Sequence, residues 1–354
     1  MFVALRSRLG NVTSELEEGL VATINDVARL AGVSPMTASR VVNGTGNVRP
    51  ESREKVLRAV EALGYTRNYA ASALRRRGTP TWTVGLVLED VANPYQAQLH
   101  RQIEDAVRER GSLVLAASTD EDPRRMSDLI LELRSRQVDG LVVAPPPGDQ
   151  SYLAAGQRQG IPLVLVDRPA VGIAAPAVLS DGRRGTRDAV GHLVAHGHRR
   201  IAYITDLRSA TMRERHAGFL DGLREHGLAP DDALVRTDVE APELAAATVR
   251  ELLALPEPPS ALITGRDGTT VGAVRGLHAA GAQHRVAMVG FDDVELADLL
   301  EPGLTVVAQD PAAVGRNAAQ LLLRQLADPA TPVEGVRVPT TLIPRGSGEL
   351  PAPG

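Results

Sequence analysis

Five residues near the amino terminus carry side chains that suit contact with DNA: Pro35, Met36, Thr37, Ser39 and Arg40. The apolar residues around them recur at helical spacing, which predicts that these five face outward from one short helix. An arginine there can contact phosphates or base edges, and a methionine can contact the methyl group of thymine. Two structural alternatives stay open, since Arg40 can be a solvated helix arginine and Met36 can fill a core.

Residues 23–43 predict the two helices that would position this surface. Thr23 is a suitable N-cap for the first helix, and Asp26 three residues later is typical of a capping box. Gly32 ends that helix, and Ser34 can cap a second helix directly after it. Such a helix is ~13 Å long and slim enough for the major groove of DNA. The apolar residues expected to form a small core are Val27, Ala28, Ala31, Val33, Ala38, Val41 and Val42.

A third helix and a helix-prone linker follow. Pro50 opens the predicted third helix, at about 50–63, and Gly64 ends it. Residues 67–77 are rich in alanine but too short to form a stable helix alone in water. The sequence therefore predicts a helix-turn-helix unit at residues 22–66 and a hinge helix with linker at residues 67–80.

Charge is divided unevenly along the chain. The formal net charge is −4, but residues 22–78 carry ten Lys or Arg and four Asp or Glu, a net charge of +6. Residues 79–354 carry 27 Lys or Arg and 36 Asp or Glu, a net charge of −9. A basic head on an acidic body favours phosphate binding by the head alone.

Composition excludes several classes of protein. The chain has no cysteine, which excludes disulfides, thiolate metal sites and cysteine nucleophiles. No window approaches the ~20 apolar residues that a membrane span needs. Residues 1–21 lack the apolar core and cleavage site of a signal peptide, so we expect a disordered N-terminal extension and a cytoplasmic protein.

From residue 83 onward, short β-rich runs alternate with helical stretches. This alternation predicts an α/β body with doubly wound parallel sheets, in which ligands bind at the carboxyl ends of the strands. Seven runs are too many for one lobe, and Ser180-Asp181-Gly182 marks the expected crossing between two. The predicted strands are residues 84–88, 113–117, 140–143, 162–166, 200–204, 260–263 and 286–290.

A series of spaced motifs carries a family resemblance. The motifs are Val27-Ala28, Ala31-Gly32-Val33-Ser34, Thr37-x-Ser39-Arg40-Val41-x-Asn43, Leu63-Gly64-Tyr65 and Asn68-x-x-Ala71-x-x-Leu74. Residues 22–347 resemble the lactose-repressor (LacI/GalR) family of bacterial transcription regulators. The resemblance implies an all-α helix-turn-helix DNA-binding head and a two-lobed effector domain, residues 81–347, that is similar to periplasmic sugar-binding proteins. Its N-lobe would comprise about 81–181 plus 308–330, its C-lobe about 182–307 plus 331–347, and residues 348–354 would be a tail.

The resemblance also implies which residues contact DNA. In the family the second helix reads the major groove. By position, Pro35 and Met36 fall where operator sequence is discriminated, and Thr37, Ser39 and Arg40 fall where phosphates and base edges are contacted. Leu74 would wedge into the central minor groove and kink the DNA, the alternative being that it packs the hinge against the body. The implied DNA-binding set is Thr23, Ser34, Pro35, Met36, Thr37, Ser39, Arg40, Asn43, Asn68, Tyr69, Ala71, Leu74 and Arg75.

Polar residues at the ends of the predicted strands are candidates for an effector site. Carboxylate, amide and guanidinium groups that face one cleft can hydrogen-bond adjacent hydroxyls of a small polar molecule. The alternative is that strand-end Asp and Asn residues only cap the next helix. The candidates are Asn93, Tyr95, Asp167, Arg215, Arg266, Asp292 and Gln309.

Three positions depart from the family's pattern. Arg266 stands where relatives usually carry asparagine, Gln96 where a second aromatic often follows the first, and Val239 near a usual ring-stacking position. A pyranose usually stacks on an aromatic ring, and an added guanidinium suits a phosphate or carboxylate, so an anionic sugar derivative is one expectation. The alternative is that Arg266 pairs with Asp267 or Asp292.

Catalytic and metal sites are not expected. His192, His196 and His198 lie close together, but Gly197 ends a helix between them, and this segment matches a structural part of the family. The chain has no P-loop, no Gly-x-Ser-x-Gly elbow and no Gly-x-Gly-x-x-Gly motif after a strand. We therefore expect no enzyme, no cofactor and no metal.

Together these features predict a sequence-specific transcriptional regulator, a repressor, whose operator affinity is controlled by a sugar or sugar derivative bound between two lobes. We expect a nucleoid-associated homodimer, because two heads match a near-palindromic double-stranded operator. Because only seven residues follow Ser347, we expect no heptad-bearing tail that could make tetramers. The alternative is a solute-binding receptor of periplasmic type without gene control, which the basic head disfavours.

Overall fold

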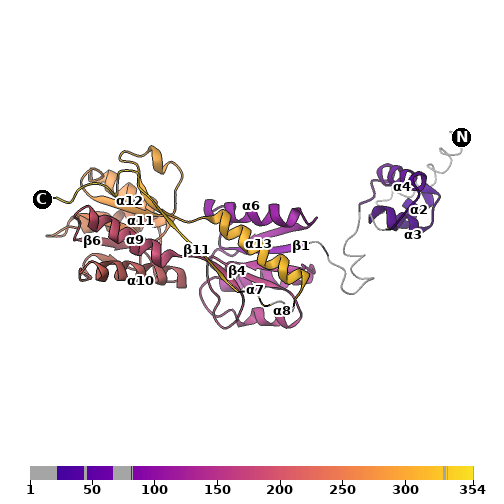
Figure 1. Cartoon of the computed structure of the whole chain (residues 1–354), viewed down its shortest axis with the longest axis horizontal. Coiled ribbons are helices and arrows are strands. Elements are labelled where there is room, and N and C mark those ends of the chain that lie inside the picture. Colours follow the sequence, from indigo (N-terminus) through magenta and orange to yellow (C-terminus); the bar gives the residue numbers. More distant parts are fainter. Residues whose placement is uncertain are drawn as a thin grey trace. The chain divides into compact units, whose positions relative to one another are not determined.

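A computed structural model describes residues 22–43, 46–66, 81, 83–329, 332 and 334–353. The chain separates into two compact units, residues 1–81 and residues 82–354 (Figure 1). The first is the helical head, and the second is an α/β body with two lobes. The predicted N-terminal extension lies outside the described residues, as does the predicted hinge with Asn68, Tyr69, Ala71, Leu74 and Arg75.

The head contains three described helices, α2 (Ile24–Ala31), α3 (Pro35–Val42) and α4 (Pro50–Leu63). The N-caps of α2 and α3 are the predicted residues, Thr23 and Ser34. The backbone N–H and the hydroxyl of Thr23 both donate to Asp26 Oδ2, at 2.9 and 2.6 Å, and Ser34 Oγ accepts from the N–H of Thr37 at 3.1 Å. Gly32 ends α2 in the left-handed region at φ +66°. These caps hold α2 and α3 as two short helices around a tight turn.

The three helices share one small core. It buries residues of α2 and α3 against α4, as the apolar spacing predicts. The buried members are Val27, Ala28, Ala31, Ala38, Val41, Val56, Ala59 and Leu63, with Val33 and Val42 packed at its margin. The polar face of α3 is therefore turned away from the core.

The N-lobe is built on a six-stranded, fully parallel sheet with the order β11-β5-β4-β3-β1-β2. Its strands are β1 (Thr83–Leu88), β2 (Leu113–Ser118), β3 (Gly140–Val143), β4 (Leu163–Val166), β5 (Ala177–Ser180) and β11 (Val336–Val338). One face packs on α6 (Pro94–Arg108) and α13 (Pro311–Ala327), and the other on α7 (Pro123–Ser135) and the segment before α8 (Ala154–Arg158). Both faces are covered, which is why the central strands are continuously apolar.

The C-lobe repeats this plan with a six-stranded sheet of order β12-β10-β9-β8-β6-β7. Only β12 runs antiparallel to its neighbour. Its strands are β6 (Ile201–Ile204), β7 (Val235–Arg236), β8 (Ala261–Thr264), β9 (Ala287–Phe291), β10 (Thr305–Ala308) and β12 (Thr341–Ile343). The helices α9 (Gly182–Ala195) and α10 (Ala210–Glu225) cover one face, and α11 (Pro242–Leu253) and α12 (Asp267–Ala279) cover the other. All seven predicted strands are found within one or two residues of their expected bounds.

The chain crosses between the lobes three times, after β5, after β10 and after β11. The expected assignment of all of residues 331–347 to the C-lobe is wrong, because β11 pairs in parallel with β5 of the N-lobe, with Val338 opposite Ser180. The sequence of a three-residue edge strand does not indicate which lobe it joins, because its pairing partner lies far away in the sequence. The chain returns to the C-lobe only after β11, with β12 and the residues that follow it.

The expected tail, residues 348–354, is not a separate segment in its described part. Glu349 Oε2 accepts from Thr305 Oγ1 at 2.8 Å, and its Oε1 lies 2.5 Å from His192 Nε2. Buried His198 places Nε2 2.8 Å from the carbonyl oxygen of Leu350. Residues 347–352 therefore pack on the C-lobe, and these histidines hold the segment in place. Within the described ranges no helix is long and apolar enough to cross a membrane, and no group of three or more His, Asp or Glu could hold a metal ion.

Candidate functional site

The outer face of α3 is the candidate nucleic-acid surface. Pro35, Met36 and Arg40 are exposed there, and 66% of Met36 is accessible to solvent. That exposure removes the alternative in which Met36 fills the core. The stem of Arg40 lies beside Gly46 in the following turn, and its guanidinium forms no ion pair within the described part of the chain. An exposed methionine and an unpaired guanidinium are free to meet base edges and phosphates.

Thr37 and Ser39 are half-buried, so they are less exposed than Pro35, Met36 and Arg40 on the same helix. The hydroxyls of Ser34 and Thr37 lie 2.9 Å apart, and Ser39 Oγ accepts from Asn43 Nδ2 at 3.0 Å. Short hydroxyl side chains on a short helix satisfy one another and the helix ends first. Each hydroxyl keeps further hydrogen-bonding capacity toward a ligand at the surface.

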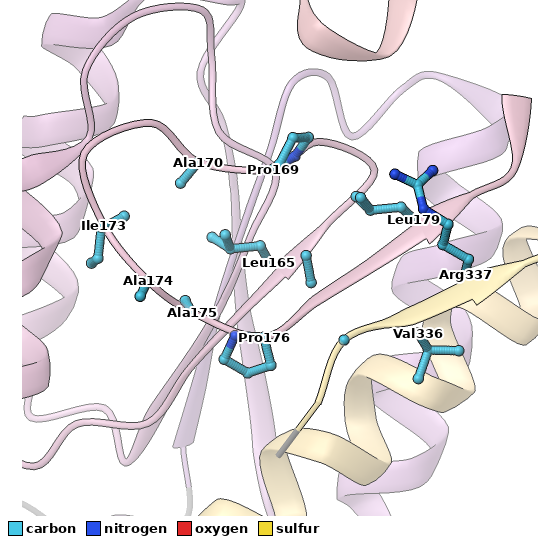
Figure 2. Close-up of a pocket in the computed structure, with 12 residues that line it drawn as sticks. Leu165, Pro169, Ala170, Ile173, Ala174, Ala175, Pro176, Leu179, Val336 and Arg337 are labelled. Carbon is cyan, nitrogen blue, oxygen red and sulfur yellow. The ribbon is translucent and has the colours of Figure 1, made fainter. Parts of the chain in front are cut away.

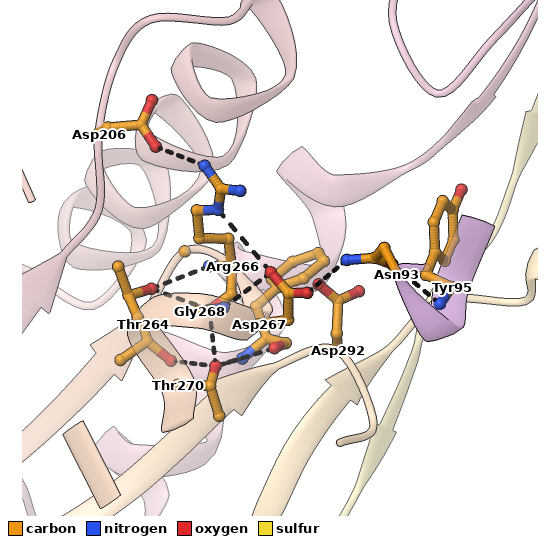
Figure 3. Close-up of polar contacts among 12 residues, drawn as sticks. Asn93, Tyr95, Asp206, Thr264, Arg266, Asp267, Gly268, Thr270 and Asp292 are labelled. Atoms are coloured by element: carbon orange, nitrogen blue, oxygen red, sulfur yellow. Dashed lines mark hydrogen bonds and ion pairs between the residues drawn. The ribbon is translucent and has the colours of Figure 1, made fainter. Parts of the chain in front are cut away.

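The seven predicted effector residues come together where the strand ends of the two lobes meet, a region that we name the interlobe site. Figure 3 shows Asn93, Tyr95, Arg266 and Asp292 in this region. Asn93 caps the next helix, as the structural alternative expects, and also reaches the other lobe. Its Oδ1 caps α6 by accepting from the N–H groups of Tyr95 and Gln96, at 2.9 and 3.3 Å. Its Nδ2 donates to Asp267 Oδ2 across the lobes at 2.8 Å.

Tyr95 and Asp167 form the N-lobe side of the interlobe site. Burial, followed by the nearby Asp167 carboxylate, raises the pKa of the Tyr95 phenol well above its usual value, so this hydroxyl stays protonated. Asp167 has φ +64°, an uncommon left-handed conformation for a residue other than glycine. Its carbonyl oxygen accepts from Thr211 Oγ1 of α10 at 2.9 Å, which joins the two lobes.

Asp292, Gln309 and Arg215 form the C-lobe side. Gln309 Nε2 donates to Asp292 Oδ1 at 2.6 Å, and Asp292 also has a positive φ, +69°. Arg215 is almost fully buried, with its Cζ 3.6 Å from the centre of the Phe291 ring and one nitrogen donating to Gly265 O at 2.8 Å. Burial raises the pKa of Asp292 to about 6, because the attraction of Arg215 only partly offsets it.

Arg266 is surrounded by carboxylates. Its guanidinium nitrogens lie 3.3 Å from Asp206 Oδ2 (Figure 3) and 3.5 Å from Glu89 Oε1. The expected contact with Asp267 is present but longer, at 3.8 Å, and Arg266 forms no ion pair with Asp292 within the described residues. These carboxylates compensate its charge, so Arg266 alone no longer argues for an anionic effector.

Several charged residues of the interlobe site were not predicted from the sequence. Arg168 contacts Glu89 and also lies 2.9 Å from Glu121 Oε1. Glu121 in turn lies 3.0 Å from Arg208 of the C-lobe. Like the predicted residues, they follow the carboxyl ends of strands, namely β1, β2, β4 and β6. The strand-end signal could have found them, but nothing in the sequence indicates which charges pair.

The pocket in Figure 2 lies elsewhere in the N-lobe. It has a volume of about 620 Å³ and is lined by β4, β5, β11 and the segment 169–176. Its lining is mostly apolar, and Arg337 at its side is paired with Glu214 at 2.9 and 3.0 Å. None of the seven predicted effector residues lines it, and it lacks the hydrogen-bonding groups that a hydroxyl-rich ligand needs.

Family comparisons match both units of the chain. Residues 23–68 match the profile of bacterial regulatory proteins of the lacI family, and residues 190–348 match a periplasmic binding protein-like domain. The ribose operon repressor of Escherichia coli (strain K12) is 32% identical over 334 residues, which are 92% of this chain and 100% of that protein.

Two solved structures extend the similarity to three dimensions. The Lac repressor dimer bound to operator and an anti-inducer has a TM-score of 0.80 at 26% identity, covering 93% of this chain and 99% of that one. The complex of the transcriptional regulator CelR with cellobiose has a TM-score of 0.67 at 30% identity, covering 92% of this chain and 99% of that one.

Proposed function

The chain belongs to the lacI family of bacterial regulatory proteins, and from this premise we propose how its two units act. It is a DNA-binding transcriptional regulator and not an enzyme. One observation carries the proposal: the same chain holds a helix-turn-helix with an exposed α3 face and a body whose strand ends converge on one polar site. We therefore propose a repressor that works in the cytoplasm on nucleoid DNA. Its head would bind the DNA, and its body would bind a small molecule.

The head would place α3 in the major groove of the operator. Pro35 and Met36 would discriminate base sequence, and Arg40 would contact phosphates or base edges. The half-buried hydroxyls of Thr37 and Ser39 would contribute through their remaining hydrogen-bonding capacity. The other proposed DNA-binding residues are Thr23, Ser34, Asn43, Asn68, Tyr69, Ala71, Leu74 and Arg75.

The effector would be a small hydroxyl-rich molecule held at the interlobe site. The relatives support a sugar, since one is a repressor of the ribose operon and another was solved with cellobiose. Acceptors and donors that could bind hydroxyls come from Asn93, Tyr95, Asp167, Asp292 and Gln309, with Arg215 beneath them. Arg266 would act there mainly through its contacts with carboxylates of both lobes.

A second copy of the chain would cover the edge strand β2. Leu113 and Leu115 are 70% and 39% exposed, and β2 ends the N-lobe sheet. Exposed apolar edges otherwise invite aggregation, and homodimers bury them. Two heads would then match the halves of a near-palindromic operator. Leu113→Glu is expected to shift the chain toward monomer in sedimentation, with Leu131→Glu as the control, because Leu131 lies on the solvent-exposed side of α7.

The test of the function is a binding assay with full-length protein and the DNA upstream of its own gene. Fluorescence anisotropy should show tight, salt-dependent binding, and Met36→Ala should change the preferred sequence more than the affinity for random DNA. Addition of the cognate sugar should shift the operator affinity. Sugar binding without any specific DNA binding would favour a solute receptor instead.

A further inference from the structure

We propose that Glu89 makes the interlobe site reject anionic ligands, because its two carboxylate oxygens engage one arginine from each lobe. The inference relies on the proposed function only for placing the effector at this site. It concerns the net charge of the interlobe site, which follows from the contacts between the described residues.

Glu89 directly follows β1 and lies between two guanidiniums. Its Oε2 contacts Arg168, which follows β4 of the same lobe, and its Oε1 lies 3.5 Å from Arg266, which precedes α12 of the other lobe. The side chains of Arg168 and Arg266 are 9% and 24% exposed, so water screens these contacts only partly. One carboxylate therefore engages both arginines.

Each of the two arginines has a further acidic partner. Arg168 also contacts Glu121 at 2.9 Å, and Arg266 also contacts Asp206 at 3.3 Å. The remaining cations are engaged as well, because Arg208 pairs with Glu121 and Arg215 donates to Gly265 O. Three of the four guanidiniums are therefore paired with carboxylates, and Arg215, which has no ion pair within the described residues, is almost fully buried.

Carboxylates outnumber guanidiniums at the site. Six carboxylates and four guanidiniums meet there, and Asp292 forms no ion pair within the described part of the chain. An incoming anion would therefore meet net negative charge, whereas hydroxyls can donate to the free carboxylate oxygens. The members are Glu89, Glu121, Asp167, Asp206, Asp267 and Asp292 against Arg168, Arg208, Arg215 and Arg266.

Replacing Glu89 should reverse this selection. Glu89→Gln keeps the size of the side chain but removes the charge that engages Arg168 and Arg266. Arg168 and Arg266 would each lose one acidic partner, and their guanidiniums would both lie beside the uncharged side chain at position 89. Two guanidiniums close together bind phosphate well.

The experiment measures binding of inorganic phosphate to the full-length chain by calorimetry, at constant ionic strength and with chloride as the reference anion. The basic head is identical in all variants, so differences between them report on the body. We expect Glu89→Gln to bind phosphate at least about tenfold more tightly than the wild type. The double variant Glu89→Gln/Arg266→Gln should lose this gain.

Glu214→Gln is the matched control. It removes another carboxylate that pairs across the lobes, with Arg337, but outside the interlobe site. It should leave phosphate binding unchanged. If Glu89→Gln does not fold, Asp206→Asn releases Arg266 from the C-lobe side and should give a smaller gain.

Wild-type phosphate binding that equals that of Glu89→Gln and is lost in Arg266→Gln would overturn the proposal. So would an equal gain in Glu214→Gln. Neither result touches the proposed function, because operator binding by the wild-type chain and its response to neutral sugars are measured separately.

Discussion

Replacing Asp292 by asparagine is expected to raise the free energy of unfolding at neutral pH, although Asp292 belongs to the proposed effector site. Asp292 is half-buried, burial raises the pKa of its carboxyl, and its positive φ, +69°, is one that asparagine tolerates well. Asparagine also keeps an oxygen that can accept from Gln309 Nε2, as Asp292 Oδ1 does at 2.6 Å. The substitution therefore removes mainly the cost of burying a charge.

The pKa gives the size and the sign of the effect. The pKa of Asp292 is raised from 3.8 to about 6 in the folded chain, so the folded state holds the proton more tightly than the unfolded state. The stability that this provides is present below about pH 4 and is lost as the pH rises through about 6. At 1.36 kcal/mol per pKa unit, the loss is about 3 kcal/mol. The Asp292→Asn variant should not show it.

The assay is urea unfolding of wild type and variant between about pH 4 and pH 8, at one protein concentration, followed by circular dichroism. The variant minus wild-type difference should rise by about 3 kcal/mol across this range and level off above about pH 7. Asp293→Asn is the matched control. Its exposed carboxylate pairs with Arg345 at 2.6 Å, so this variant should not gain stability. A difference for Asp292→Asn that is flat or falls with pH would refute the reasoning.

Three further outcomes are expected. Arg40→Ala should weaken operator binding and reduce the slope of log affinity against log salt by roughly 2 for a dimer, whereas Arg58→Ala, whose guanidinium already pairs with Glu54, should change that slope little. Gly218→Ala should destabilise the C-lobe by about 1–3 kcal/mol in urea unfolding, since its Cβ would lie 2.0 Å from the carbonyl oxygen of Arg183 in α9. Asp292→Asn should also weaken sugar binding in calorimetry at neutral pH, and the affinity of the wild type should fall below about pH 6, because protonation removes an acceptor.

The head and the central strands could be predicted because their signals are local. Caps at Thr23 and Ser34, the stop at Gly32 and buried parallel strands with no polar face each appear within a few residues of sequence. Five strands, β5, β7, β10, β11 and β12, were not among those predicted, since they have only two to four residues each and owe their order to partners elsewhere in the sheet.

The interlobe site likewise has features that could be predicted from the sequence and features that could not. Strand ends indicated which side chains would meet, and Asn93 both caps its helix and reaches across the lobes. The pairing of charges depends on distances between loops of different lobes. Sequence reasoning therefore offered Asp267 and Asp292 as partners for Arg266, whereas the shortest contacts are with Asp206 and Glu89.

The three crossings between the lobes also constrain the order in which the chain can fold during synthesis. The N-lobe begins first, but α13, which fills one face of its core with Val314, Ala318 and Leu322, is made only at residues 311–327. The C-lobe needs little beyond the continuous stretch from α9 to β10. The later lobe can thus be nearly complete on the ribosome while the earlier one still exposes Leu86 and Val142. Nascent chains halted before residue 311 should therefore depend on chaperones more than those released after residue 327.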